Sequence, residues 1–256
     1  MENTTTEFGR KKRVAALDTL RGAAIIFVVV YHLLYDLSVF GVNLPFFYSR
    51  TMEIIHFVFL AILMSVSGIC TAFSRNIFKR GAVIYLLGEG ITLVTSLLLP
   101  SERIVFGVLS FFGMMMLIYG VCKPVLDKLN PYVMLAVWIV LYIVFRDFSS
   151  EQVIQLGFTD ITVRTTAAAA AYLYPIGITA PSFRSSDYFA LIPWGFIFMA
   201  GTALSKPVSQ RKLPKQFYEI KCPPIDFLGR NTLIIYVLHQ PVIYGIVWLI
   251  FTYIVR

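Results

Sequence analysis

The sequence predicts an all-α, polytopic helical membrane protein with about seven transmembrane helices and a cytoplasmic N-terminus. Its 256 residues are 58% hydrophobic and only 14% charged, whereas soluble chains carry about 25% charged residues. Apolar blocks of roughly 20 residues, the length that spans a bilayer, recur between short charged segments. The blocks are continuous, which excludes the alternating pattern of a transmembrane β-barrel. The composition also excludes a disordered chain.

The apolar blocks make one integral-membrane domain of residues 1–256. The expected spans are residues 16–40, 53–74, 81–100, 104–122, 132–147, 187–205 and 231–254. Three longer connections remain: a basic cytoplasmic tail at 1–13, an outer loop at 148–186 and a basic cytoplasmic loop at 206–230.

The lysine and arginine positions predict the orientation. With the N-terminus inside, 15 of the 22 basic residues fall on inner segments, including every lysine, and six fall on outer segments. This bias is typical of cytoplasmic loops. It also explains the net charge of +8 without a nucleic-acid partner.

The stretch 162–180, with its alanine run, could be counted as an eighth span. That count would place the basic 206–230 loop outside and break the charge bias. We therefore expect a re-entrant or surface helix in the outer loop.

The first span carries the strongest chemical signal. Arg21 lies near its inner end, and His32 follows eleven residues later, about 16 Å along a helix axis. Asp36 is one turn beyond His32 on the same face, so its carboxylate could orient the imidazole of a general base. The alternative is a hydrogen bond that joins helices. Arg21 could bind a phosphate or form a salt bridge with Asp18.

Polar residues at the outer ends of other spans form a second group. Glu53 and His56 begin the second span, and Arg184 and Asp187 precede the sixth. Together with His239 of the seventh span, they are candidates for the substrate side of a site. In structural terms, Ser186 would cap the sixth span and Asp187 would lie in its first turn.

Two further polar residues lie inside spans. Glu89, near the middle of the third span, needs a partner, and pairing between helices is the simpler expectation. His239 lies before Pro241 in the seventh span. Because Pro241 removes a backbone donor, His239 or Gln240 could satisfy the freed carbonyl group.

The chain resembles the heparan-α-glucosaminide N-acetyltransferase catalytic-domain family, whose bacterial members are small multi-pass proteins. The segments that carry the resemblance run in order along the chain: Leu17–Gly22, Tyr31-His32 with Asp36, Ser67–Ile69, Ile104–Leu109, Asp187–Phe189, Ile192–Trp194, Leu228–Asn231, Tyr236 and Leu238–Pro241. The spacing from Arg21 to His32 also looks like that of the wider superfamily of membrane acyltransferases that modify envelope sugars.

The resemblance implies a reaction. Acetyl-CoA would bind from the cytoplasm, and its acetyl group would pass to an amine or hydroxyl acceptor, such as an envelope sugar, on the outer side. An outer histidine that the family requires falls on His32, as general base or transient acyl carrier, with Asp36 beside it. Arg21 and some of four other basic residues would neutralise the CoA phosphates; the four are Arg75, Arg80, Lys212 and Arg230. No metal is implied, and the location would be the inner membrane of a bacterial cell.

Two other function classes stay open at this level. A proton-coupled transporter could use His32, Glu89 and His239 as a relay, and a non-catalytic membrane subunit would tolerate loss of His32. The sequence contains no GxxxxGK[ST], HExxH or GxSxG motif, so those kinds of hydrolysis lack support. It leaves open whether the chain forms a homodimer.

Overall fold

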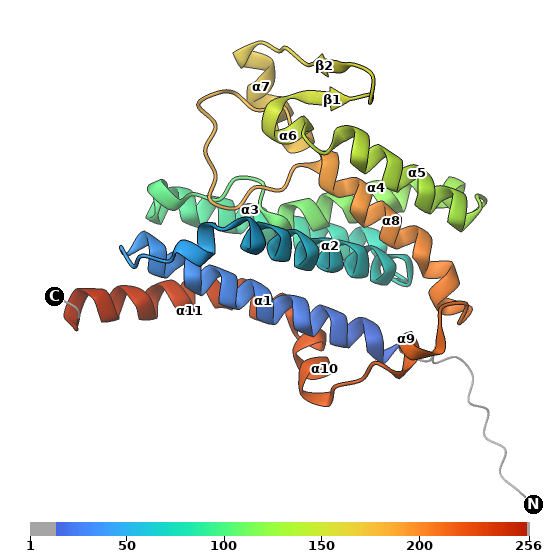
Figure 1. Ribbon diagram of the computed structural model, residues 1–256, viewed down its shortest axis with the longest axis horizontal. Helices are drawn as coiled ribbons and strands as arrows, with labels where there is room; N and C mark the ends of the chain where they lie inside the picture. The colour runs from blue at the N-terminus through green and yellow to red at the C-terminus, as the bar shows by residue number, and fades with distance from the viewer. Residues whose placement is uncertain (1–13, 255–256) are drawn as a thin grey trace, which may run out of the picture. The chain divides into compact units, whose positions relative to one another are not determined.

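The computed structural model describes residues 14–254 and confirms the helical membrane architecture (Figure 1). Seven helical segments in this range are long and apolar enough to cross a membrane, the fifth being counted together with the short helix after it. The seven long helices are α1 (Ala15–Val39), α2 (Arg50–Ala72), α3 (Ile77–Leu98), α4 (Val108–Leu126), α5 (Pro131–Phe145), α8 (Leu191–Ser209) and α11 (Thr232–Tyr253). The basic tail expected at 1–13 lies outside the described residues.

The connections contain short elements. They are η1 (Pro45–Tyr48), η2 (Pro100–Glu102), α6 (Phe148–Glu151), β1 (Val153–Gln155), β2 (Asp160–Thr162), α7 (Ala167–Leu173), η3 (Tyr174–Ile176), α9 (Lys215–Glu219) and α10 (Pro223–Arg230). The alanine-rich stretch forms only α7 and η3, a helical segment of residues 167–176. Ten residues rise about 15 Å as an α-helix, half the hydrocarbon thickness, so this segment is too short to span.

Two details of the outer loop differ from the sequence prediction. Strands β1 and β2 form an antiparallel hairpin, with Ile154 opposite Ile161, where only a helix was expected. Three-residue strands are too short to show a periodic pattern.

The sixth span begins at Leu191 with Ala190 as its N-cap, so Ser186 is not the cap and Asp187 is not in the first turn. The residues before it are held extended, since the Phe189 N–H donates to the Phe106 carbonyl oxygen.

The chain divides into two compact units, which we describe separately. The first unit comprises residues up to Leu63 and from Leu213 onward, and the second comprises Met64–Lys212. Helix α2 contributes its first part to the first unit and its last part to the second.

In the first unit, α1 packs along α11 and against α10 (Figure 1). The contact with α10 depends on two glycines: a Cβ at Gly22 would overlap the Ile225 carbonyl oxygen, and a Cβ at Gly229 would overlap that of Asp18. Small residues permit such close backbone approach between membrane helices. The Thr19 hydroxyl donates to Asp226 Oδ1 at 2.5 Å across the same contact.

In the second unit, α3 packs on α4 and α5 packs on α8. The Ser110 hydroxyl of α4 donates to Glu89 Oε1 of α3 at 3.0 Å, which confirms pairing between helices as a role of Glu89. The end of α2 also lies close to α8, because a Cβ at Gly68 would overlap the Phe198 carbonyl oxygen.

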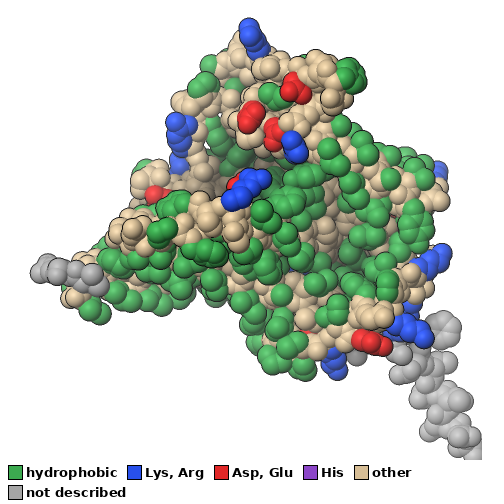
Figure 2. Space-filling view, viewed as in Figure 1, with side chains coloured by type: hydrophobic (Ala, Val, Ile, Leu, Met, Phe, Trp, Pro, Cys, Tyr) green, Lys and Arg blue, Asp and Glu red, His purple; other side chains and the backbone are tan. Residues whose placement is uncertain are grey.

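Hydrophobic side chains cover much of the helical surface in view (Figure 2). On α3, Leu86 and Leu97 are 67% and 71% exposed, and α5 has no buried residue. Such surfaces are costly in water and suit lipid contact. The exposed faces of these helices therefore fit the bilayer.

A glycine pair tests the close contact in the first unit. We expect Gly22→Ala to destabilise the protein by about 1–3 kcal/mol, because the added methyl group overpacks the contact with Ile225. Gly245→Ala is the matched control, since Gly245 of α11 has open space at its Cβ position and alanine favours the helix. Thermal unfolding in detergent measures both. Equal melting temperatures for the two variants would contradict the contact.

Candidate active site

The first unit brings all three histidines of the chain together. His32 of α1 lies edge-on to His239 of α11, with ring centroids 4.9 Å apart. His56 of α2 stacks on Tyr31 at 4.1 Å with an interplanar angle of 7°, and Tyr31 is the neighbour of His32. Three imidazoles from distant parts of the sequence therefore share one region of the unit.

Aromatic rings surround this histidine cluster, which consists of His32, His56 and His239. Phe27 stacks on Phe59 at 4.4 Å, and Phe47 lies 5.0 Å from Tyr31. The ring centroid of Phe27 also lies 6.2 Å from that of His56, so aromatic rings border this imidazole.

Asp36 is 2% exposed and is bound to the last long helix. The Gln240 side-chain amide donates to Asp36 Oδ1 at 2.9 Å, while Gln240 Oε1 is buried without a hydrogen-bond partner among residues 14–254. This bond joins α1 to α11 one turn from His32. The structure therefore supports the joining role that the sequence allowed for Asp36, and orientation of His32 by Asp36 stays a prediction.

His239 has a defined tautomer when neutral. Its Nδ1 lies 2.6 Å from the Tyr236 carbonyl oxygen, which can only accept a hydrogen bond, so Nδ1 carries the proton and Nε2 holds the basic lone pair. The carbonyl freed by Pro241 belongs to Val237, and these bonds of His239 and Gln240 go to Tyr236 and Asp36 instead. The expectation that they satisfy the freed carbonyl is therefore not supported.

Two arginines flank the close contact at the other end of α1. Arg21 is next to Gly22, and Arg230 is next to Gly229, whose Cβ position lies 3.0 Å from the Gly22 nitrogen. The Arg230 Nε donates to the Asp226 carbonyl oxygen at 3.2 Å. The Arg21 guanidinium forms no hydrogen bond or salt bridge within residues 14–254, so the pair with Asp18 is not formed there. Two arginines and two buried carboxylates, Asp18 and Asp226, thus lie at this end of α1.

Other predicted residues have local partners. Glu53 forms an exposed salt bridge with Arg50 at 2.9 Å. In the second unit, Arg80 donates to the Ser74 hydroxyl at 3.3 Å, and Arg75 and Lys212 are exposed. These positions leave the side chains accessible to an anionic ligand.

Arg184 and Asp187 organise the outer loop of the second unit. Arg184 Nη1 donates to the carbonyl oxygens of Pro181 and Phe183. The Val108 N–H donates to Asp187 Oδ2 at 3.3 Å, so this carboxylate caps α4 rather than the helix that follows it. Close by, burial raises the pKa of the Tyr188 phenol, and the neighbouring Tyr174 raises it further.

Sequence reasoning undervalued two residues. Tyr31 was noted only as the neighbour of His32, although it supplies the ring on which His56 stacks. Gln240 was considered only as a partner for a backbone carbonyl, although it binds the buried Asp36. A polar side chain beside a histidine inside an apolar span is the signal that could have identified Gln240.

A comparison against known families identifies the family of the chain. Residues 13–241 match the family described as heparan-alpha-glucosaminide N-acetyltransferase, catalytic. The chain belongs to this family. No curated protein and no solved structure matches it.

Family membership makes the chain, in general terms, a membrane acetyltransferase. The family generally uses acetyl-CoA as its donor. Within the described part of the chain, no group of three or more histidine, cysteine or acidic side chains is placed to hold a metal ion.

A double-mutant cycle tests the bond between α1 and α11. We expect Asp36→Ala and Gln240→Ala to show a coupling free energy of about 0.5–2 kcal/mol, because each removes the partner of the other inside the membrane. Chemical unfolding of wild type, single variants and double variant in the same detergent measures it. Strictly additive effects would rule out a direct interaction.

Proposed function

We propose that this protein transfers an acetyl group from cytoplasmic acetyl-CoA to an amine or hydroxyl group, on an envelope-sugar acceptor, at the outer face of the inner membrane of a bacterial cell. The observation that carries the proposal is that the two ends of α1 carry different functional groups. One end of α1 carries Arg21 beside the close contact with α10, and the other half of the helix joins the histidine cluster. The two regions are about 16 Å apart along the helix axis.

The guanidinium groups at the arginine end suit the phosphates of the donor. Guanidinium groups bind phosphate oxygens with two donors in a fixed fork, and Arg21 and Arg230 flank one close backbone contact. Arg21 has its donors available within the described part of the chain. Arg75, Arg80 and Lys212, which the charge bias also places on inner segments, are further candidates for the CoA phosphates.

The histidine cluster fits the chemistry of acetyl transfer. His32, as general base, takes a proton from the acceptor nitrogen or oxygen, which attacks the thioester carbonyl carbon. The carbon–sulfur bond breaks, the CoA thiolate leaves with the electron pair, and His32 returns the proton to it. Alternatively, His32 itself takes the acetyl group and then passes it to the acceptor.

The neighbouring groups would assist this step. Asp36 stabilises the protonated imidazole of His32, and His239 presents a basic Nε2 when its Nδ1 binds the Tyr236 carbonyl. His56 and Glu53 are proposed to contact the acceptor from α2, and Arg184 and Asp187 are proposed to do so from the outer loop.

Calorimetry with acetyl-CoA tests the donor without knowledge of the acceptor. We expect saturable micromolar binding to the purified protein, weakened about tenfold or more by Arg21→Ala, because a charged hydrogen bond to phosphate is lost. Arg50→Ala is the matched control, since Arg50 is an exposed arginine paired with Glu53. If the folded protein did not bind acetyl-CoA, this compound would be excluded as the donor. A transporter or a non-catalytic subunit would then be favoured.

Replacement of the proposed base tests the chemistry. His32→Ala should lower acetyl transfer to amino sugars by about a hundredfold or more and leave acetyl-CoA binding intact, because His32 lies far from the arginine end. Radiolabelled acetyl transfer measures this effect, with Lys128→Ala as control because Lys128 is exposed and has no role in the proposed site. Wild-type turnover in the His32→Ala variant would contradict the catalytic role of His32.

A further inference from the structure

The hairpin in the outer loop of the second unit carries an exposed aromatic ring at its tip. A tight turn joins β1 to β2, because the Leu156 N–H donates to the Thr159 carbonyl oxygen at 3.1 Å and Gly157 adopts a φ of 83°. Phe158, the other residue of the turn, is 88% exposed. Hairpin turns usually carry glycine, asparagine, aspartate or serine. A bare phenyl ring at this position therefore points to an apolar environment.

The hairpin is apolar on one face and more polar on the other. Side chains of a strand alternate between its two faces. Ile154 lies opposite Ile161, and Gln155 lies opposite Asp160, so the isoleucine pair and the polar pair occupy opposite faces. By the same alternation, Leu156 shares the face of the isoleucine pair. The apolar face therefore runs along the hairpin to the turn, which itself carries no charged residue.

The outer loop covers only part of this apolar face. Ile154 packs against the buried core of the loop, around Phe148. In contrast, Ile161 is 48% exposed and Leu156 is 39% exposed, and every residue of β2 is exposed. The apolar face thus continues beyond the core of the loop and ends in the exposed ring of Phe158.

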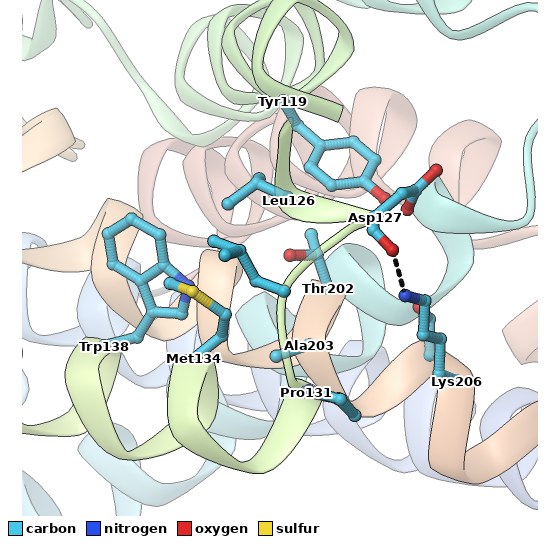
Figure 3. Close-up of a pocket in the computed structure, with 11 residues that line it drawn as sticks. Tyr119, Leu126, Asp127, Pro131, Met134, Trp138, Thr202, Ala203 and Lys206 are labelled. Carbon is cyan, nitrogen blue, oxygen red and sulfur yellow. Dashed lines mark hydrogen bonds between the residues drawn. The ribbon is translucent and has the colours of Figure 1, made fainter. Parts of the chain in front are cut away.

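The hairpin lies beside α5, a helix with a lipid-facing surface. Strand β1 packs against α5, and the turn is at the end of the hairpin away from α7 (Figure 1). Protein closes one side of α5: Met134 and Trp138 border α4 and α8 there, around a cavity of about 30 Å³ with room for about one water molecule (Figure 3). Elsewhere on α5, Val140 and Ile143 are 57% and 54% exposed. The uncovered part of the hairpin is therefore next to a helix that contacts lipid.

The size of the exposed patch favours lipid over protein as its partner. The hairpin offers three exposed apolar side chains, those of Leu156, Phe158 and Ile161, whereas a standard protein–protein interface takes about 20–30 residues from each partner. A bilayer requires no matching shape, and aromatic side chains are common at its interface. We propose that the turn between β1 and β2 inserts into the bilayer beside α5, with Phe158 and Leu156 among the acyl chains and Asp160 among the head groups. This role is independent of the proposed acetyl transfer.

Fluorine NMR with paramagnetic additives tests the location of the turn. Trifluoromethyl-phenylalanine replaces Phe158 in the full chain, which is reconstituted into phosphatidylcholine vesicles. Dissolved oxygen concentrates in hydrocarbon, whereas a nickel chelate stays in water, so the two additives report opposite environments. We expect oxygen to broaden the signal at position 158 more than the chelate does. The same label at Arg164, an exposed charged residue of the same loop, is the matched control and should show the reverse order.

A charge at the tip tests whether the ring anchors the hairpin. With the label at Leu156, Phe158→Asp should reverse the order of the two additives, because a carboxylate is costly among acyl chains and withdraws the turn into water. Phe158→Leu should keep the order, since leucine is also apolar. Melting temperatures in detergent show whether both variants fold. If Phe158→Asp does not fold, the label at position 158 still decides the location.

Three other outcomes would overturn the proposal. Stronger broadening by the nickel chelate at position 158 would place the turn in water. Weak broadening by both additives would place the turn under protein; nanodiscs that hold a single chain then distinguish a second copy, whose removal uncovers the label, from another segment of the same chain. An unchanged order of the additives in folded Phe158→Asp would show that the ring of Phe158 does not anchor the hairpin in lipid.

Discussion

Close backbone approach between α1 and α10 is the constraint on which the first unit depends. In lipid, apolar side chains gain little by packing on each other, so helices associate through shape, small residues and hydrogen bonds. Gly22 and Gly229 remove the side chains that would separate the two backbones. Arg21 and Arg230 are the chain neighbours of these two glycines, so the same contact brings the backbone at both arginines to this end of α1.

Three carboxylates accept hydrogen bonds from neutral donors on neighbouring helices. Asp36 accepts from the Gln240 amide, Glu89 accepts from the Ser110 hydroxyl, and Asp226 accepts from the Thr19 hydroxyl. Each bond joins two helices, and the bonds to Asp36 and Glu89 reduce the cost of an acidic group inside a membrane span. In the first unit, the bond to Asp36 also holds α11 at the position where His239 meets His32.

The sequence segments that resemble the family turn out to be contact partners. Leu17–Gly22 packs against the helix that ends in Leu228–Arg230, and Ile104–Leu109 exchanges hydrogen bonds with the Ser185–Phe189 region. His32 meets His239 in the same way. These segments therefore serve packing as well as chemistry: Asp187 caps α4, and Gly22 and Gly229 permit close approach, whatever roles their neighbours have in acetyl transfer.

Local patterns determined much of this protein. The seven spans, and the short helix in the outer loop, follow from apolar block length, because a bilayer imposes one length on every crossing. The offset from Arg21 to His32 follows from helix geometry alone. The sequence could not show that His56 stacks on Tyr31, that Gln240 binds Asp36, or that an outer aspartate caps α4, since each joins residues that are far apart along the chain or on different helices. Which helices become neighbours depends on side-chain shape and on hydrogen bonds between spans. Only the tertiary structure decided those contacts, and with them the gathering of three histidines into one cluster.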